Sequence, residues 1–371
     1  MKKGWTYKKL GEVAKVIHGK NQKDVLSEGG RYPIYGSGGH IMGYATDYLC
    51  EAGSTILGRK GSINNPQYIE DRFWNVDTAF GIMPKDDNCS KYIYYFIKSI
   101  DWSKKNTGTT LPSLTQQVVK DVVIPMPNLS EQRSIVARLD AAFADIDALK
   151  ANAEKQLSEA RQLFQAELTE CMRPKEGWEV KTLGELATDM YRGSGIKRDQ
   201  VTKEGIPCVR YGEIYTTYNV AFEECVSHTN EEMISSPKYF EHGDLLFAIT
   251  GESVEDIGKT IAYLGKEKCL CGGDIICMKH KQNAKFLSYA LSTSDAIRQK
   301  GIGKTKLKVV HTNAPALKAI SVPVPSLEDQ HQIVSYLDVL SARVKQLEEV
   351  QRKTMEECDA LKQAMLREVF E

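Results

Sequence analysis

Two stretches of this 371-residue chain occur twice, and this duplication constrains the fold more than any other feature. GWTYKKLGEVA begins at Gly4 and returns as GWEVKTLGELA at Gly177, 173 residues later. DVVIPMPNLSEQRSIVARLD begins at Asp121 and returns as AISVPVPSLEDQHQIVSYLD at Ala319, 198 residues later. A period this long indicates a duplicated domain rather than a solenoid of short repeats. The second copy carries 25 more residues (198 − 173) between its matched segments.

Each copy of the second segment leads into what reads as one long helix. The P-x-P sequences at 125–127 and 323–325 end an extended segment, because proline disfavours helix before it. Asn128 and Ser326 each stand three residues before an acid, the spacing of a capping box. Apolar residues then recur every three or four positions for about 44 residues, which corresponds to roughly 66 Å of helix.

The two helices are expected to pair with each other. The first apolar stripe consists of Ile135, Leu139, Phe143, Ile146, Leu149, Ala153, Leu157, Ala160, Phe164 and Leu168, and the second of Ile333, Leu337, Leu340, Val344, Leu347, Val350, Cys358, Leu361, Met365 and Val369. A long helix with one apolar stripe must bury it against another helix. We expect an antiparallel pair, because the second domain begins where one helix ends and finishes where the other begins. The similar stripes also predict that a fragment of residues 1–175 would pair with a second copy of itself.

The sequence therefore predicts an α+β (mixed α/β) protein. Its two globular domains, residues 1–127 and 174–325, would be separated by an antiparallel pair of long helices, residues 128–173 and 326–371, with pseudo-two-fold symmetry. Both domains read as short strands and turns with little helix.

The two domains share a scaffold and differ in their loops. Ser54–Leu57 and Asp244–Thr250 are expected as matching central strands, and Phe73–Phe80 as a further strand whose place Leu270–Cys277 takes in the second domain. Tyr92–Lys98 is expected to be helical, with Phe286–Leu291 as its counterpart. A repeated scaffold with different loops suits recognition of two different targets.

The charge distribution excludes a chain that coats DNA non-specifically over its whole surface. The net charge is zero overall and +5 over residues 1–128, which hold 17 basic and 12 acidic residues. Residues 176–325 balance at 19 and 19, and residues 326–371 hold 6 basic and 10 acidic residues, a net −4. DNA contact is therefore expected from local basic loops.

The motifs of an enzyme are missing. Asn65-Pro66-Gln67 lacks the second proline and the aromatic residue of a DNA methyltransferase motif, and no Walker loop occurs. Of nine scattered cysteines, only Cys269, Cys271 and Cys277 lie close together, and without a CxxC pair they read as buried thiols rather than zinc ligands. We expect a non-catalytic, cytoplasmic protein without a metal or cofactor of its own.

The candidate DNA-contacting residues are those that suit base edges and phosphates. Arg and Lys contact guanine, Asn and Gln contact adenine, and Ser and Thr contact either. The candidates in the first domain are Ser37, His40, Arg59, Lys60, Ser62, Asn64, Lys104, Lys105, Thr107, Thr109 and Thr110, and those in the second are Lys197, Arg198, Arg210, Tyr211, Glu252, Lys304, Lys306 and Lys308. The last three lysines follow Gly301 and Gly303, which would let their backbone approach phosphates closely.

The whole pattern resembles the specificity subunit of type I restriction–modification enzymes. The resemblance is carried by the two Gly-Trp starts, the junctions Pro125–Gln132 and Pro323–Gln330, the strand and loop Ile56–Gly61, and Gly272-Gly-Asp274. It implies two target-recognition domains that each read one half of a split sequence in double-stranded DNA. It also implies helices that act as a spacer and dock two methyltransferase subunits, with restriction subunits joining that core.

On this resemblance S-adenosylmethionine, Mg²⁺ and ATP would belong to the partner subunits. Two alternatives stay open from the sequence. One is a free-standing DNA-binding or scaffold protein that acts without methyltransferase partners, and the other is an enzyme with an unrecognised active site.

Overall fold

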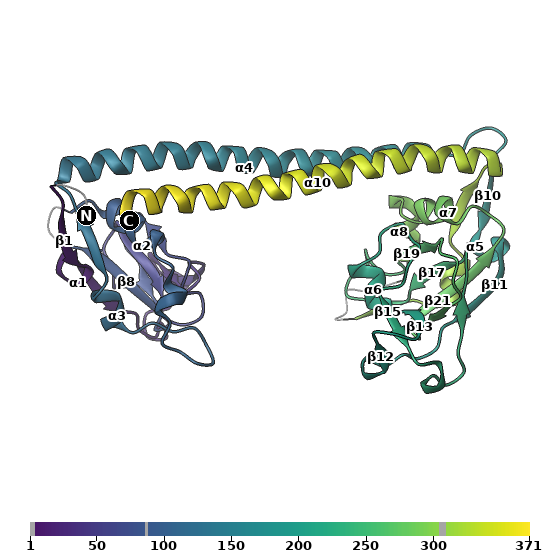
Figure 1. Cartoon of the computed structure of the whole chain (residues 1–371), viewed down its shortest axis with the longest axis horizontal. Coiled ribbons are helices and arrows are strands. Elements are labelled where there is room, and N and C mark those ends of the chain that lie inside the picture. The colour runs from purple at the N-terminus through teal and green to yellow at the C-terminus, as the bar shows by residue number, and fades with distance from the viewer. Residues whose placement is uncertain (1–3, 86–87, 304–308) are drawn as a thin grey trace. The chain divides into compact units, whose positions relative to one another are not determined.

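The computed structural model describes residues 4–85, 88–303 and 309–371, and its fold is α+β (Figure 1). The chain divides into two compact units. Unit 1 comprises Met1–Glu154 and Gln351–Glu371, and unit 2 comprises Lys155–Val350. Each unit therefore contains one globular domain together with part of both long helices.

The domain of unit 1 is built on two sheets and a strand pair. One sheet has the order β2 (Ala14–His18), β8 (Ala79–Pro84), β5 (Ser54–Gly58), β6 (Gln67–Ile69), and the other has the order β4 (Ile41–Ala45), β3 (Tyr32–Tyr35), β7 (Trp74–Asn75). The strand pair joins β1 (Thr6–Lys9) to β9 (Val123–Met126). Short helices α1 (Leu10–Val13), α2 (Ser90–Ser99) and α3 (Gln116–Lys120) and the 3₁₀ helix Trp102–Lys105 complete the domain.

The domain of unit 2 has two larger sheets and two strand pairs. The first sheet has the order β11 (Ala187–Arg192), β21 (Ile275–His280), β17 (Leu245–Ala248), β19 (Thr260–Tyr263), β14 (Ala221–Phe222). The second has the order β12 (Val201–Thr202), β15 (Ser227–Thr229), β13 (Ile206–Val209), β20 (Cys269–Cys271), β16 (Tyr239–Phe240). The pairs are β10 (Glu179–Thr182) with β23 (Ser321–Val324) and β18 (Thr250–Gly251) with β22 (Val310–His311).

Helices of unit 2 cover these sheets and connect their strands. They are α5 (Leu183–Leu186), α6 (Tyr211–Thr216), α7 (Ala284–Ala290), α8 (Ser294–Lys300) and α9 (Ala314–Lys318), with 3₁₀ helices at Arg198–Gln200 and Glu231–Met233. The expected helices at Tyr92–Lys98 and Phe286–Leu291 are confirmed as α2 and α7.

The matched sequence segments meet in space within each unit. Strand β1 follows the first Gly-Trp and pairs antiparallel with β9, which precedes the first long helix, so that Thr6 lies opposite Met126. Strand β10 follows the second Gly-Trp and pairs antiparallel with β23, so that Glu179 lies opposite Val324. The repeat thus closes each domain at the point where its long helix begins.

The expected single strand Phe73–Phe80 is wrong. The chain forms β7 in one sheet, turns after Asn75, and continues as β8 in the other sheet. The Asn75 side chain stabilises this turn by donating a hydrogen bond to the Ala79 carbonyl at 3.0 Å. The segment Leu270–Cys277 divides in the same way into β20 and β21, and Gly272 forms the turn. Apolar patterning alone does not reveal this break, because buried residues stand directly before it, at Val76, and directly after it, at Ala79.

The long helices are α4 (Leu129–Cys171), with 43 residues, and α10 (Leu327–Phe370), with 44. The caps form as expected, because Asn128 Oδ1 accepts from the Glu131 amide at 3.0 Å and Ser326 Oγ accepts from the Asp329 amide at 3.2 Å. The Glu131 carboxylate accepts a hydrogen bond from Trp5 Nε1 at 3.0 Å. The first Gly-Trp segment is therefore attached to the start of α4.

The two helices pack together and run antiparallel, as expected. In unit 1, Lys150 of α4 pairs with Asp359 of α10, and Asp147 pairs with Lys362. In unit 2, Arg161 pairs with Glu348. In unit 1, Lys150 follows Asp147 along α4, whereas its partner Asp359 precedes Lys362 along α10. This order of partners is that of antiparallel helices.

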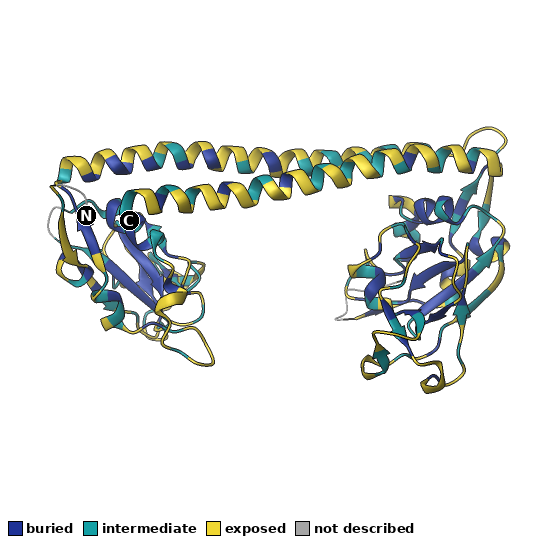
Figure 2. Cartoon of the chain, in the orientation of Figure 1, coloured by how far each residue is buried: buried dark blue, intermediate teal, exposed yellow. Residues whose placement is uncertain are grey.

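Part of each expected apolar stripe is buried (Figure 2). Buried members include Ile135, Leu139, Ile146, Leu337 and Cys358. Three members of the expected stripes instead lie exposed, since Leu149, Val350 and Leu361 each keep about half of their surface. A stripe wide enough to cover a domain core is wider than the seam between two helices, so its margin faces solvent.

Candidate functional site

Three loops of unit 1 that contain candidate residues converge on one surface. The loop after β5 pairs with the Thr-rich loop, because the Gly61 amide donates to the Pro112 carbonyl at 2.9 Å and the Leu114 amide donates to the Arg59 carbonyl at 2.9 Å. The turn at Gly36–His40 joins them through the Asn65 side chain, which donates to the Gly38 carbonyl at 3.4 Å. Loops far apart in the sequence thereby form a single polar surface.

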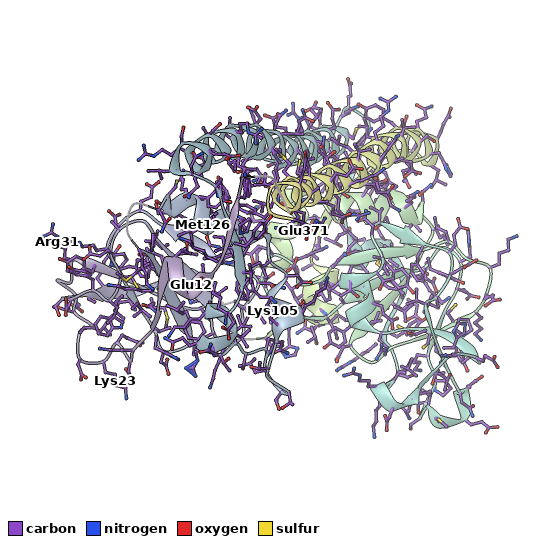
Figure 3. All side chains as sticks on the ribbon, turned by 60° about the vertical axis from the view of Figure 1, so that its left-hand side comes forward. Glu12, Lys23, Arg31, Lys105, Met126 and Glu371 are labelled. Atoms are coloured by element: carbon purple, nitrogen blue, oxygen red, sulfur yellow. The ribbon has the colours of Figure 1, made fainter. Side chains whose placement is uncertain are left out.

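The loop after β5 and the segment 103–112 form a depression of about 350 Å³, lined by Gly61, Ser62, Ile63, Asn64, Asn65, Ser103, Asn106 and Pro112. The candidates His40, Lys60, Ser62, Asn64, Lys104, Lys105, Thr107, Thr109 and Thr110 are exposed on or beside this surface, and Ser37 and Arg59 are half-buried. Figure 3 shows Lys105 farther from the helix pair than Met126 and Glu371, which lie close to the helices. The expected residues of the first domain are therefore brought together.

Two of these candidates have structural roles that limit their freedom. The Asn64 side chain donates to Asp101 at 3.2 Å and accepts from the Trp102 amide at 2.6 Å, so both ends of its amide are occupied. Arg59 donates to the Asp77 carbonyl at 3.2 Å. Asn64 thus positions the loop that begins at Asp101, while its exposed neighbours remain available for contact.

Hydrogen bonds and charges stabilise the same surface. The Ser103 hydroxyl and the Asn64 amide donate to Asp101 and hold the pKa of that carboxyl below its usual range. Burial and the nearby charge of Arg59 lower the pKa of His18. Asp101 is therefore ionised and fixes the base of a loop whose exposed end carries Lys104 and Lys105.

Unit 2 contains a depression of about 520 Å³. It is lined by Gly195, Ile196, Arg198, Arg210, Tyr211, Gly212, Glu213, Thr216, Gly272, Gly273 and Asp274. Three candidates, Arg198, Arg210 and Tyr211, therefore share one site, and Lys197 is exposed beside Arg198. The guanidinium groups of Arg198 and Arg210 line this depression together with glycines, and they suit an anionic or polar ligand that approaches the backbone closely.

Arg210 is oriented by a buried acid. Its Nε lies 3.1 Å from Glu213 Oε1, and the same oxygen accepts from the Ser227 hydroxyl at 2.6 Å. Glu213 is 7% exposed, so its charge has little access to water and depends on these partners. The arrangement holds Arg210 in place at the rim of the depression.

The remaining candidates of the second domain lie elsewhere. Glu252 is exposed directly after β18 and does not line the depression. Lys304, Lys306 and Lys308 lie outside the described residues, so the expected phosphate contact there stays a prediction.

Sequence reasoning missed several residues that shape these surfaces. Asn106 organises the Thr-rich loop, because its side-chain oxygen accepts from the amides of Gly108 and Ser113, both at 2.8 Å. Arg192 pairs with Asp274 at 2.7 Å on the wall of the unit-2 depression. An arginine directly before the Gly-Ser-Gly turn at 193–195 is a signal that could have identified the latter.

The glutamine that ends each P-x-P-x-L-x-E/D-Q junction anchors a long helix to its domain. In unit 1, Gln132 accepts from the Cys89 amide at 3.1 Å and donates to the Pro127 carbonyl at 2.9 Å. In unit 2, Gln330 accepts from the Asn283 amide at 2.9 Å and donates to the Pro325 carbonyl at 3.0 Å. These two contacts recur in both units, which gives a physical reason for a glutamine at this place in both copies, and Gln330 donates in addition to Gln282 Oε1 at 2.7 Å.

A second pair of duplicated contacts lies two turns further along each helix. Asp140 of α4 accepts hydrogen bonds from Lys91, at 3.0 Å, and from Tyr95. Asp338 of α10 accepts from Lys285 at 2.7 Å and from Tyr289 at 2.8 Å. Each domain is therefore joined to its helix by a buried glutamine and by an aspartate clamp.

The repeat, the paired junctions and the antiparallel helices agree with one family. The family model described as type I restriction modification DNA specificity domain matches residues 2–159 and 175–356, which together make up more than half of the chain. The chain belongs to this family. It is a type I DNA specificity subunit that recognises DNA sequence with two domains and is itself non-catalytic.

Curated relatives are similar over nearly their whole length. A putative type I restriction enzyme specificity subunit of Haemophilus influenzae is 24% identical over 345 residues, covering 90% of this chain and 86% of the relative. The EcoDI specificity subunit of Escherichia coli is 22% identical over 404 residues, covering 99% of this chain and 88% of the relative.

Solved structures share the fold. A chain from a study of complex assembly and conformational transition of the type I R-M system is 19% identical with a TM-score of 0.75, covering 99% of this chain and 97% of that chain. The HsdS subunit of Thermoanaerobacter tengcongensis is 20% identical with a TM-score of 0.54, covering 100% and 97%.

Neither a metal site nor a membrane span is found among the described residues. Among the described residues, no group of three or more His, Cys, Asp or Glu side chains could hold a metal ion. Cys271 and Cys277 are buried, and burial raises the pKa of both thiols. In the described part of the chain no helix is both long and apolar enough to span a membrane.

Proposed function

We propose that each domain reads one half of a bipartite site in double-stranded DNA through the surface described above. In unit 1 this surface is formed by the loops at 36–40, 58–65 and 103–113, and in unit 2 by the rim of the depression that contains Arg198, Arg210 and Tyr211. The convergence of three candidate loops on one surface of unit 1 is the observation that best supports the proposal. Arg, Lys, Ser and Thr side chains suit phosphates and base edges.

Methylation of DNA by the assembled enzyme tests this assignment. Replacing residues 30–64 by the corresponding segment of a relative should change one half of the methylated sequence and leave the other half unchanged. Arg198→Ala should lower affinity roughly 5- to 150-fold and relax specificity in the other half only. The control Arg173→Ala removes an exposed arginine that pairs with Glu170 and should leave methylation unchanged. If exchange of residues 30–64 alone changes both halves of the methylated sequence, the assignment is refuted.

Phosphate contacts are tested through the dependence of DNA affinity on salt. Changing Lys60, Lys104 and Lys105 to Ala should reduce the slope of log affinity against log salt by roughly one to three units for all sequences. Lys8, Lys155 and Lys353, which are exposed elsewhere, provide a matched triple substitution. An unchanged slope would remove the unit-1 loops from the interface.

We further propose that the helix pair docks methyltransferase subunits, two in each assembly, and that restriction subunits join them. In unit 2, a groove of about 300 Å³ between α4 and α10 is lined mainly by apolar side chains, including Phe164, Leu340 and Leu347. Leu163 at this groove is 64% exposed. An apolar groove on a helix pair suits a partner helix.

Substitution of the groove tests the docking. Leu163→Glu should displace the methyltransferase subunit docked at this groove and lower the ratio of methyltransferase subunit to this chain after co-purification from a co-expression strain. Lys155→Glu, exposed on the same helix, should leave the ratio unchanged. An unchanged ratio with Leu163→Glu would show that no methyltransferase subunit docks at this groove. On this proposal S-adenosylmethionine, Mg²⁺ and ATP are bound by the partners, and the complex acts on DNA in the cytoplasm.

A further inference from the structure

The ion pairs between α4 and α10 have reversed charges in the two copies of the repeat. Each position of α4 corresponds to the α10 position 198 residues later, so that Lys150 corresponds to Glu348 and Arg161 to Asp359. In unit 1, Lys150 Nζ lies 2.8 Å from Asp359 Oδ2, and in unit 2, an Arg161 Nη lies 2.8 Å from Glu348 Oε1. Equivalent positions are thus bridged in both units, with acid and base exchanged.

The equivalence of these positions rests on contacts as well as on alignment. Gln132 and Gln330 are 198 residues apart and make the same two hydrogen bonds. Asp140 and Asp338 have the same spacing and each accept from a lysine and a tyrosine. Both helices continue without interruption from these anchors through the ion pairs, so the register is preserved.

A second copy of α4 would not reproduce these bridges. In an antiparallel pair of two α4 helices in the same register, Lys150 would face Arg161 of the other copy. Asp147, which pairs with Lys362 in the native protein, would face Phe164, the residue that corresponds to Lys362. The ion pairs of Lys150, Arg161 and Asp147 are then lost. Lys150 of each copy lies instead opposite Arg161 of the other copy, which is a contact between like charges.

Two copies of α10 would be mismatched as well. Glu348 would face Asp359 of the other copy, and Lys345 would face Lys362. The apolar seam offers no comparable discrimination, because the buried positions Leu139 and Leu168 have leucine in the second copy too, at 337 and 366.

We propose that the ion pairs Lys150–Asp359 and Arg161–Glu348 form a charge code that selects α10 as the partner of α4 and rejects a second copy of either helix. Charges that flank an apolar seam set partner choice in paired helices, and like charges exclude the wrong partner. This argues against the expectation that residues 1–175 pair readily with themselves. Pairing of identical helices would bring together two copies of one domain, so the code also determines which domains act together.

The full-length variant E348K/D359R tests the code, because it gives α10 the charges of α4 at both positions. Lys150 then faces an arginine and Arg161 faces a lysine, as in a pair of α4 helices. Amide hydrogen exchange across residues 143–164 and 345–362 should become at least about tenfold faster at low salt. The difference should shrink in 1 M salt, where the Debye length is about 3 Å instead of about 10 Å at 0.1 M.

Two controls separate pairing from other effects. The quadruple variant K150E/R161D/E348K/D359R restores opposite charges and should return exchange to the wild-type rate. E349K/E357K makes the same change in net charge on exposed positions of α10 and should have little effect. If E348K/D359R fails to fold and the quadruple variant folds, the code is supported. Wild-type exchange in E348K/D359R, or no recovery in the quadruple variant, would overturn it.

Discussion

Replacement of Gln132 by methionine should weaken the junction between the unit-1 domain and α4. Methionine has a similar length but neither accepts from the Cys89 amide nor donates to the Pro127 carbonyl, the two contacts that Gln132 makes at 3.1 and 2.9 Å. Gln132 is 3% exposed, so water has little access to replace it. Each backbone group left without a partner costs about 1–3 kcal/mol, and we therefore expect a loss of about 2–4 kcal/mol in the free energy of unfolding.

The equivalent change in unit 2 provides an internal replicate. Gln330→Met removes the contacts to Asn283 and Pro325 and should cost a similar amount. Because the two junctions belong to different compact units, the double variant should lose about the sum of the two. Urea unfolding followed by circular dichroism measures the total, and amide exchange of residues 89–99 and 283–290 assigns each loss to its unit.

A matched control distinguishes the junction from a general effect of methionine on the helix. Gln162 is exposed on α4, and Gln162→Met should change stability by less than about 0.5 kcal/mol. If Gln132→Met falls within the range of this control, the glutamine does not anchor the helix and the reasoning is refuted.

Three further predictions concern a buried charge, the aspartate clamp between α4 and α2, and a tight turn. Lys300 is buried with Nζ 2.7 Å from the Leu291 carbonyl oxygen, and burial lowers its pKa to about 7. Above pH 7 the unfolded chain therefore binds more protons than the folded chain, so the free energy of unfolding of the wild type should rise from pH 7 toward pH 10. Lys300→Met should remove that rise when unfolding in urea is measured at each pH. Asp140→Asn leaves Lys91 and Tyr95 without their carboxylate and should cost about 1 kcal/mol in thermal unfolding, with an unchanged midpoint counting against the clamp. Gly58→Ala would place Cβ 2.1 Å from the Ser62 carbonyl oxygen, so it should displace the unit-1 loop and weaken DNA binding in gel-shift assays, and wild-type affinity would contradict this.

The sequence by itself determined the duplication, the family, the two long helices and their antiparallel pairing. Each of these depends on local signals: the P-x-P sequences that end a strand, the caps at Asn128 and Ser326, and apolar residues spaced three and four apart. Residues with that spacing lie on one face only when the chain is helical. The chemistry of the loops also indicated most of the candidate surface, because arginine, lysine, serine and threonine are the residue types that DNA requires.

Only the tertiary structure decided what joins these parts. The sequence does not tell that Gln132 reaches the Cys89 amide, that Asn64 is occupied by Asp101 and Trp102, or that Arg210 is oriented by the buried Glu213. Nor does it tell that Lys150 pairs with Asp359 in unit 1 while its counterpart in the repeat, Glu348, pairs with Arg161 in unit 2. Such contacts join residues distant in the chain, and their partners are set by packing in three dimensions rather than by the local spacing from which helices and caps are predicted.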